Sequence, residues 1–101
     1  MSLDQDAVIE EFQLMYDVLM QVAEDHDVDP DIADIASAAA NELEVQFIDS
    51  EAEDEDELED QYDDFIDLIE SVLDDLDENE ADNTVMGPIR KRLTKAKKLL
   101  L

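Results

Sequence analysis

Large apolar residues recur at alternating steps of four and three along the first part of this chain. In residues 5–24 these steps join five positions: Val8, Phe12, Met15, Leu19 and Val22. The spacing puts all five on one stripe of an α-helix, the a/d pattern of helices that pack lengthwise on one another. One Gly and two Pro in 101 residues leave few sites for the tight turns of a β-rich fold. The pattern therefore predicts an all-α protein.

Two further helices are predicted by their start signals. Asp29 followed by Pro30 suits an N-cap and a first helical residue, and the apolar rhythm continues over 30–48. The segment Ser50-Glu51-Ala52-Glu53 matches a capping box, which predicts a third helix over 53–79. The third helix repeats the steps of four and three in a seam made of Leu58, Tyr62, Phe65, Ile69, Val72 and Leu76.

The end of the chain differs in charge but keeps the helical spacing. Turn residues occupy 82–84, and Gly87-Pro88 predicts a fourth helix over 88–100. The apolar face of this helix would contain Ile89, Leu93, Ala96 and Leu100. We therefore expect a small antiparallel bundle of three to four amphipathic helices, at about 5–24, 30–48, 53–79 and 88–100. Residues 1–82 would form an acidic helical body, and residues 83–101 a turn plus a basic C-terminal helix packed on the same domain.

Charge is segregated along the sequence. All 32 acidic residues lie at or before Asp82, and the six basic residues lie within 90–98, so −32 and +6 give the net charge of −26. A hydrophobic content of 45% distinguishes the chain from disordered acidic tails, which are poor in apolar residues. A charge this large acts on solubility, association and choice of partner. We expect attraction to basic protein surfaces, and no direct binding to nucleic acid or to membranes.

Several functional classes lack their usual residues. Without cysteine there is no disulfide, thiol nucleophile or zinc–thiolate site. The N-terminus lacks the features of a signal peptide, and no segment approaches the ~18 apolar residues of a membrane span, so we expect a cytoplasmic protein, or one in the host cytoplasm if it is viral. The alternating acids of 25–31 resemble the start of an EF-hand loop, but Pro30 and Ala36 stand where Gly and Glu are required. We expect no catalytic residues, no metal site and no cofactor.

The third helix carries the main functional prediction. Residues 51–80 hold 17 acids, or one negative charge per ~2.6 Å if they are helical throughout, against one per ~1.7 Å in duplex DNA. A rigid row of carboxylates resembles a phosphate backbone, so we expect a non-enzymatic nucleic-acid mimic that inhibits a host restriction, CRISPR, repair or transcription factor. The expected partner-binding residues are Glu51, Glu53, Asp54, Glu55, Asp56, Glu57, Asp60, Asp63, Asp64, Asp67, Glu70, Asp74 and Glu78.

Other interpretations of the acidity remain open. Most charge runs are simply solvated helix faces. An assembly, chaperone or immunity-type protein could use the acidic body to shield a basic partner. A proteome adapted to high salt would also favour an excess of Asp (19) over Glu (13), although the basic tail counts against that hypothesis. Heptad seams are compatible with a homodimer.

The basic terminal helix has three possible roles. It could complete the bundle by docking on acidic neighbours, bind a separate partner, or lie on a membrane surface, and the acidic remainder of the chain disfavours the last of these. Its secondary basic patch consists of Arg90, Lys91, Arg92, Lys95, Lys97 and Lys98.

Overall fold

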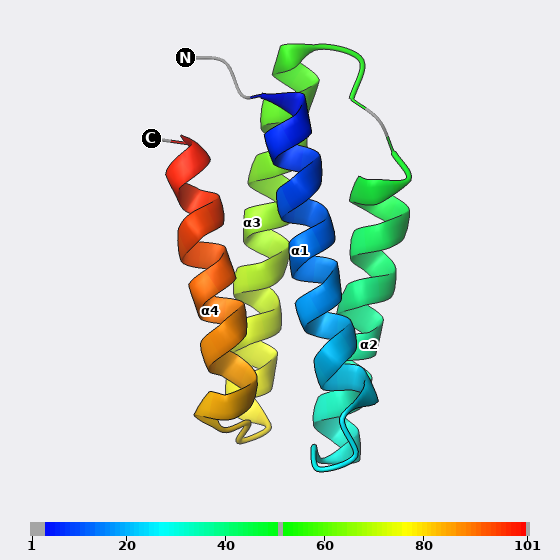
Figure 1. Ribbon diagram of the computed structural model, residues 1–101, viewed down its shortest axis with the longest axis vertical. Helices are drawn as coiled ribbons and strands as arrows, with labels where there is room; N and C mark the ends of the chain where they lie inside the picture. The colour runs from blue at the N-terminus through cyan, green and yellow to red at the C-terminus, as the bar shows by residue number, and fades with distance from the viewer. Residues whose placement is uncertain (1–3, 51, 101) are drawn as a thin grey trace.

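The protein is an all-α antiparallel bundle of four helices (Figure 1). The computed structural model describes residues 4–50 and 52–100. Successive helices run in opposite directions, and α1 and α3 each pack against both α2 and α4. The bundle measures 41 × 25 × 18 Å. Its elements are α1 (Gln5–Glu24), α2 (Pro30–Leu43), the π-helical turn η1 (Glu44–Ile48), α3 (Glu55–Glu78), α4 (Asn83–Lys97) and the 3₁₀ turn η2 (Lys98–Leu100).

The first two helices begin with aspartate caps. The carboxylate of Asp4 accepts a hydrogen bond from the backbone N–H of Asp6, and that of Asp29 accepts one from Asp31, each at 3.1 Å. Pro30 occupies the first turn of α2, where its missing N–H would have no helical partner. The predicted range of α1 is confirmed, and its five seam residues are the residues that it buries.

The second helix changes geometry near its end. Residues 30–48 were predicted to form one α-helix, whereas Glu44–Ile48 forms a π-helical turn. The turn keeps Phe47 in the core, with ring centroids 5.4 Å from Phe12 and 6.0 Å from Phe65, and leaves Val45 58% exposed. The apolar spacing of residues 30–48 predicts that Phe47 faces the core, which is confirmed, but it does not predict the π-helical geometry of the last turn.

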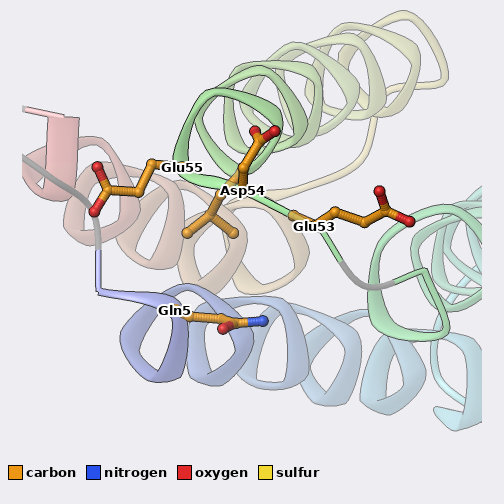
Figure 2. A pocket seen from close by; sticks show the side chains of 6 residues that line it. Gln5, Glu53, Asp54 and Glu55 are labelled. Atoms are coloured by element: carbon orange, nitrogen blue, oxygen red, sulfur yellow. The ribbon is translucent and has the colours of Figure 1, made fainter.

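The third helix begins two residues later than predicted, because a second capping pattern follows the first. The N-cap is Asp54, whose carboxylate accepts from the N–H of Glu57 at 2.8 Å, and the Glu57 carboxylate accepts from the N–H of Glu53 at 3.3 Å. Ser50 has a different role: its carbonyl accepts from Gln61 Nε2 at 2.7 Å. The predicted capping box at 50–53 is therefore wrong. This end of α3 lies opposite the start of α1 (Figure 2).

A Schellman motif ends α3. The N–H of Glu80 donates to the carbonyl of Asp77 at 3.0 Å, and the N–H of Ala81 donates to that of Leu76 at 2.9 Å. Glu80 adopts a left-handed conformation with φ of 62°, at the position that usually belongs to glycine. The short connection to α4 is therefore held by backbone hydrogen bonds at the expense of some local strain.

The fourth helix begins at Asn83, five residues before the predicted start. Asp82, predicted to be part of a turn, is the N-cap and accepts from the N–H of Thr84 at 3.0 Å. The extra turn forms because Val85 and Met86 are buried in the core, so that Pro88 falls inside the helix rather than at its start. Leu100 was also predicted to face the core, but it is 40% exposed because the chain changes to 3₁₀ geometry at Lys98.

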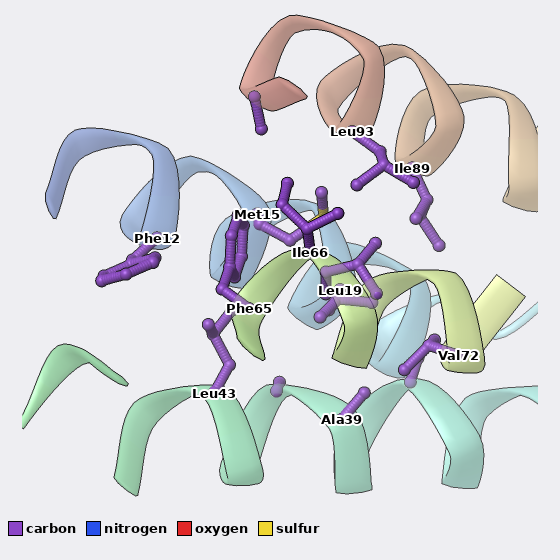
Figure 3. Packing of buried hydrophobic residues seen from close by; sticks show 14 of the residues in the cluster. Phe12, Met15, Leu19, Ala39, Leu43, Phe65, Ile66, Val72, Ile89 and Leu93 are labelled. Atoms are coloured by element: carbon purple, nitrogen blue, oxygen red, sulfur yellow. The ribbon is translucent and has the colours of Figure 1, made fainter. Parts of the chain in front are cut away.

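Every buried side chain in the part of the chain that the structure describes is aliphatic or aromatic (Figure 3). Aromatic rings gather at one level of it: the Phe12 ring lies 4.8 Å from that of Phe65 and 6.0 Å from that of Tyr62. On α2, buried alanines such as Ala36 and Ala40 leave room for α1 to approach closely. No charged residue of the described ranges belongs to this core, so the charged side chains lie at its edge or on the outside of the bundle.

Candidate functional site: an acidic helix and a basic helix

The outer face of α3 is acidic along its whole length. Thirteen of its 24 residues are Asp or Glu and none is Lys or Arg. All thirteen side chains are exposed, while the opposite stripe of the helix is buried. The helix spans ~36 Å at 1.5 Å per residue, which corresponds to one carboxylate per ~2.8 Å. The apolar seam thus fixes a rigid row of negative charge on the surface.

The predicted partner-binding acids fall into two groups. Those within α3 surround its solvent face, with Asp60, Asp67, Asp74 and Glu78 directly opposite the seam by helical spacing. Those before α3 lie at its N-terminal end, where Asp54 and Glu57 are already engaged in capping. Glu51 lies outside the described residues. The exposed members of the predicted set are Glu53, Asp54, Glu55, Asp56, Glu57, Asp60, Asp63, Asp64, Asp67, Glu70, Asp74 and Glu78.

One basic side chain of α4 reaches α1. Arg92 Nη2 lies 3.3 Å from Glu11 Oε1, and the two side chains are only 23% and 16% exposed. Arg92 Nε is buried and has no hydrogen-bond partner. The partial burial makes this pair more than a surface contact, because removing either charge would leave the other poorly solvated.

Two other basic side chains of α4 face α3. Lys97 Nζ lies 3.7 Å from Glu70 Oε2, and both side chains are about half exposed. Arg90 lines a groove of about 270 Å³ between the two helices, together with the acids Glu70, Asp74 and Asp77. These contacts compensate the acidic row along one flank and leave its outward face unpaired within the described residues.

The remaining lysines point away from the bundle. Lys91 and Lys95 on α4 and Lys98 at the start of η2 are exposed, and steps of four and three place them on one side, opposite Ile89, Leu93 and Ala96. None of the three forms an ion pair within the residues that the structure describes. The predicted basic patch is therefore divided into two parts. Arg92, Lys97 and Arg90 face α1 or α3, and the three exposed lysines form a separate outward row.

A buried hydroxyl also ties α4 to α3, and the sequence interpretation missed it. Tyr62 on α3 is fully buried, and its hydroxyl donates to the carbonyl of Ala96 at 2.6 Å. Burial raises the pKa of Tyr62 well above 10.0, the charge of Glu11 raises it further, and Arg92 lowers it. A tyrosine in an apolar seam signals such a bond, because a buried hydroxyl needs a partner.

The acids of the turn between α1 and α2 have capping roles. Asp25 accepts from the N–H of Asp27 at 2.9 Å, and Asp29 caps α2. Together with Asp82 they line a hollow of about 410 Å³ at this end of the bundle. No group of three or more His, Asp or Glu residues in the described ranges has the arrangement of a metal site. His26 is exposed in the same turn.

Membrane-spanning helices and similarity to known proteins are two further sources of functional information. Within residues 4–50 and 52–100, no helix combines the length and the apolar character that a membrane crossing requires. No protein-family model, curated protein or solved structure matches the chain.

Proposed function

We propose that the chain is a non-enzymatic binding protein that mimics nucleic acid. On this proposal its acidic helix α3 occupies the basic nucleic-acid-binding site of a host protein, such as a restriction, CRISPR, repair or transcription factor, and inhibits it. The observation that carries the proposal is the outward face of α3. Thirteen exposed carboxylates lie along one rigid helix, and among the described residues only Glu70 is paired with a basic side chain.

The charge density of α3 favours this kind of partner. One charge per ~2.8 Å of helix is of the same order as one per ~1.7 Å of duplex axis. A protein surface whose Arg and Lys bind phosphates through charge would therefore also attract this helix. Because the row is built on a buried apolar seam, the backbone positions that carry the carboxylates are fixed before binding, which lowers the entropic cost of ordering the row.

The same geometry limits what each contact contributes. An exposed ion pair contributes only ~0–1 kcal/mol, so a useful affinity requires many carboxylates to act together. Neutralising a few neighbouring acids should therefore abolish binding, while neutralising one should have little effect. Strong dependence on salt follows as well, because exposed charges are screened within ~10 Å at 0.1 M salt.

Capture from lysate tests the proposal. The immobilised protein would be exposed to a host lysate, and retained proteins would be eluted with duplex DNA. A variant with five neutralised acids on the outward face of α3 should retain none of the DNA-eluted partner. The substitutions are Asp60→Asn, Asp64→Asn, Asp67→Asn, Asp74→Asn and Glu78→Gln.

A charge-matched control separates the α3 row from net charge. The control neutralises five exposed acids on other helices or in the helix ends: Asp6→Asn, Glu10→Gln, Asp17→Asn, Glu24→Gln and Asp34→Asn. It should retain the partner at close to the wild-type level. Equal loss in both variants would show that only overall charge matters, and equal retention in both would contradict a role for α3.

A second candidate function rests on the outward lysine row of α4. Lys91, Lys95 and Lys98 have no ion-pair partner within the described part of the chain, which would suit an assembly or chaperone protein that shields a basic partner with one surface and docks elsewhere with the other. On this hypothesis, replacing the three lysines with Gln would abolish capture of the partner that docks on them. Capture by a mimic would not change. Deleting α4 would be a poor test, because Ile89 and Leu93 are part of the core.

Adaptation to high salt is a third candidate, favoured by exposed acids on α1 and α2 as well as on α3. Examples are Asp17 on α1 and Asp34 on α2. A protein of this kind would be largely unfolded at ordinary ionic strength. Far-ultraviolet circular dichroism in 0.1 M salt would separate this hypothesis from the two binding functions, which both require a folded bundle.

A further inference from the structure

A cleft with an uncharged interior opens at the end of the bundle where α1 and α3 begin. Its inner part is a recess of about 150 Å³, and none of the ten residues around it is charged. This is unusual for a chain in which 38% of the residues are charged. Phe12, Phe47 and Leu58, each at most 6% exposed, border it together with the half-buried Ile9 and Ile48.

The recess continues into an acidic opening. A neighbouring hollow of about 240 Å³ shares Gln5, Ala52 and Leu58 with the recess and adds Glu53, Asp54 and Glu55. Figure 2 shows Gln5 on α1 facing the start of α3, with the carboxylates of Glu53 and Glu55 extending to opposite sides. The two hollows thus form one cleft, uncharged and mainly apolar inside and acidic at its entrance.

The side of the cleft formed by the 46–50 segment is held in place. Gln61 on α3 donates from Nε2 to the carbonyl of Ser50 at 2.7 Å and to that of Gln46 at 3.4 Å. These bonds fix η1 and the start of the connecting segment against α3. A cleft with fixed walls needs little reorganisation when a ligand enters, which favours binding.

From this geometry we infer that the cleft binds a basic segment of a partner protein through one apolar or aromatic anchor side chain. The anchor enters the recess, and Arg or Lys residues beside it pair with Glu53 and Glu55. The inference rests on the proposed function in requiring a basic partner, and it adds a source of affinity that the weak exposed ion pairs of α3 do not provide. A buried anchor surrounded by polar contacts is the usual arrangement of an interface hot spot.

Two synthetic peptides test the inference without knowledge of the natural partner. Both are Lys- and Arg-rich eleven-residue chains, one with Phe and the other with Ser at the centre, and binding to the full chain is measured by fluorescence anisotropy in 0.15 M salt. Burial of the Phe ring should make the first peptide bind about tenfold tighter or more. Equal affinities of the two peptides for the wild-type protein would overturn the inference.

Plugged variants show where the anchor binds. Gln5→Phe and Ala52→Leu each add an apolar side chain at the cleft and should remove the preference for the Phe peptide. The matched control is Gln21→Phe, at an exposed position on the far part of α1, which should keep the preference. A preference that survives in both plugged variants would place the anchor elsewhere and overturn the inference.

A final pair of variants tests the acidic entrance. Glu53→Gln with Glu55→Gln should weaken binding of both peptides more than Glu24→Gln with Asp34→Asn, which changes the net charge equally at exposed positions elsewhere. Equal weakening would overturn the role of the entrance. These outcomes are separable from those of the proposed function: loss of the Phe preference leaves DNA competition untouched, and failure of DNA competition leaves anchored peptide binding untouched.

Discussion

Removing the hydroxyl of Tyr62 should loosen the contact between α3 and α4. The hydroxyl is fully buried and donates to the carbonyl of Ala96, so Tyr62→Phe removes one buried hydrogen bond and leaves that carbonyl with the backbone N–H of Lys98 as a donor. The expected loss is about 1–3 kcal/mol in the free energy of unfolding. For a domain of this size that corresponds to a fall in Tm of roughly 5–15 °C.

Urea unfolding followed by far-ultraviolet circular dichroism measures this loss directly. The control is Tyr16→Phe, the same chemical change at a partly exposed position, which should alter stability by less than about 0.5 kcal/mol. A loss for Tyr62→Phe no larger than that of the control would refute the argument that a buried hydroxyl holds α4 on the bundle.

The pH dependence of the same variant gives an independent check. Burial raises the pKa of Tyr62 above that of an unfolded tyrosine, so its contribution to stability is complete below pH ~10. Above that pH the unfolded state ionises first, and stability falls as the pH rises toward the folded-state pKa. Tyr62→Phe should lose this part of the alkaline slope. Tyr16, whose pKa is raised chiefly by the charge of Glu44, should contribute to the slope that remains.

Three further changes should alter stability in a known direction. Pro88→Ala restores an N–H opposite the Thr84 carbonyl at an exposed position inside α4. Thermal unfolding should show a gain of about 1–2 kcal/mol in the free energy of unfolding. A loss of stability would contradict the helical register. Glu80→Gly should relieve the left-handed strain and add about 0.5–1 kcal/mol, whereas Glu80→Gln, which removes only the charge, should gain less. Raising salt from 0.1 to 1 M should increase Tm, because it shortens the screening length from ~10 to ~3 Å across a surface of net charge −26; a Tm that does not change would mean that self-repulsion is unimportant.

Most of the fold could be predicted from apolar spacing because the buried side chains are all aliphatic or aromatic. The five seam residues of α1 and the six of α3 are all buried, as the steps of four and three require. The N-cap of α3 was harder to predict, because acids are so common here that two capping patterns overlap. Ser50 and Asp54 each stand three residues before a Glu, and Asp54 is the residue that caps the helix. Pro88 was predicted to begin α4, but burial of Val85 favours a start one turn earlier, at Asn83.

The candidate site was predictable only in part. Exposure of the α3 acids follows directly from their position opposite the seam. The division of the basic residues into paired and unpaired ones could not be predicted, because it depends on which helices flank α4. Arg92, for example, pairs with Glu11 on α1, which lies 81 residues earlier in the chain. The cleft beside Gln5 was missed for the same reason, because it forms where α1, η1 and α3 meet. Contacts between distant segments leave little trace in a single sequence.

The most direct test of the central claim is a competition titration. A captured partner would be bound to labelled duplex DNA, and the wild-type protein, the five-substitution α3 variant and the charge-matched control would each be added in increasing amounts. The account predicts that the wild type and the control displace the DNA while the α3 variant does not, and that higher salt weakens displacement. A partner that holds both DNA and the wild-type protein at saturation would contradict the claim that α3 occupies a nucleic-acid-binding site.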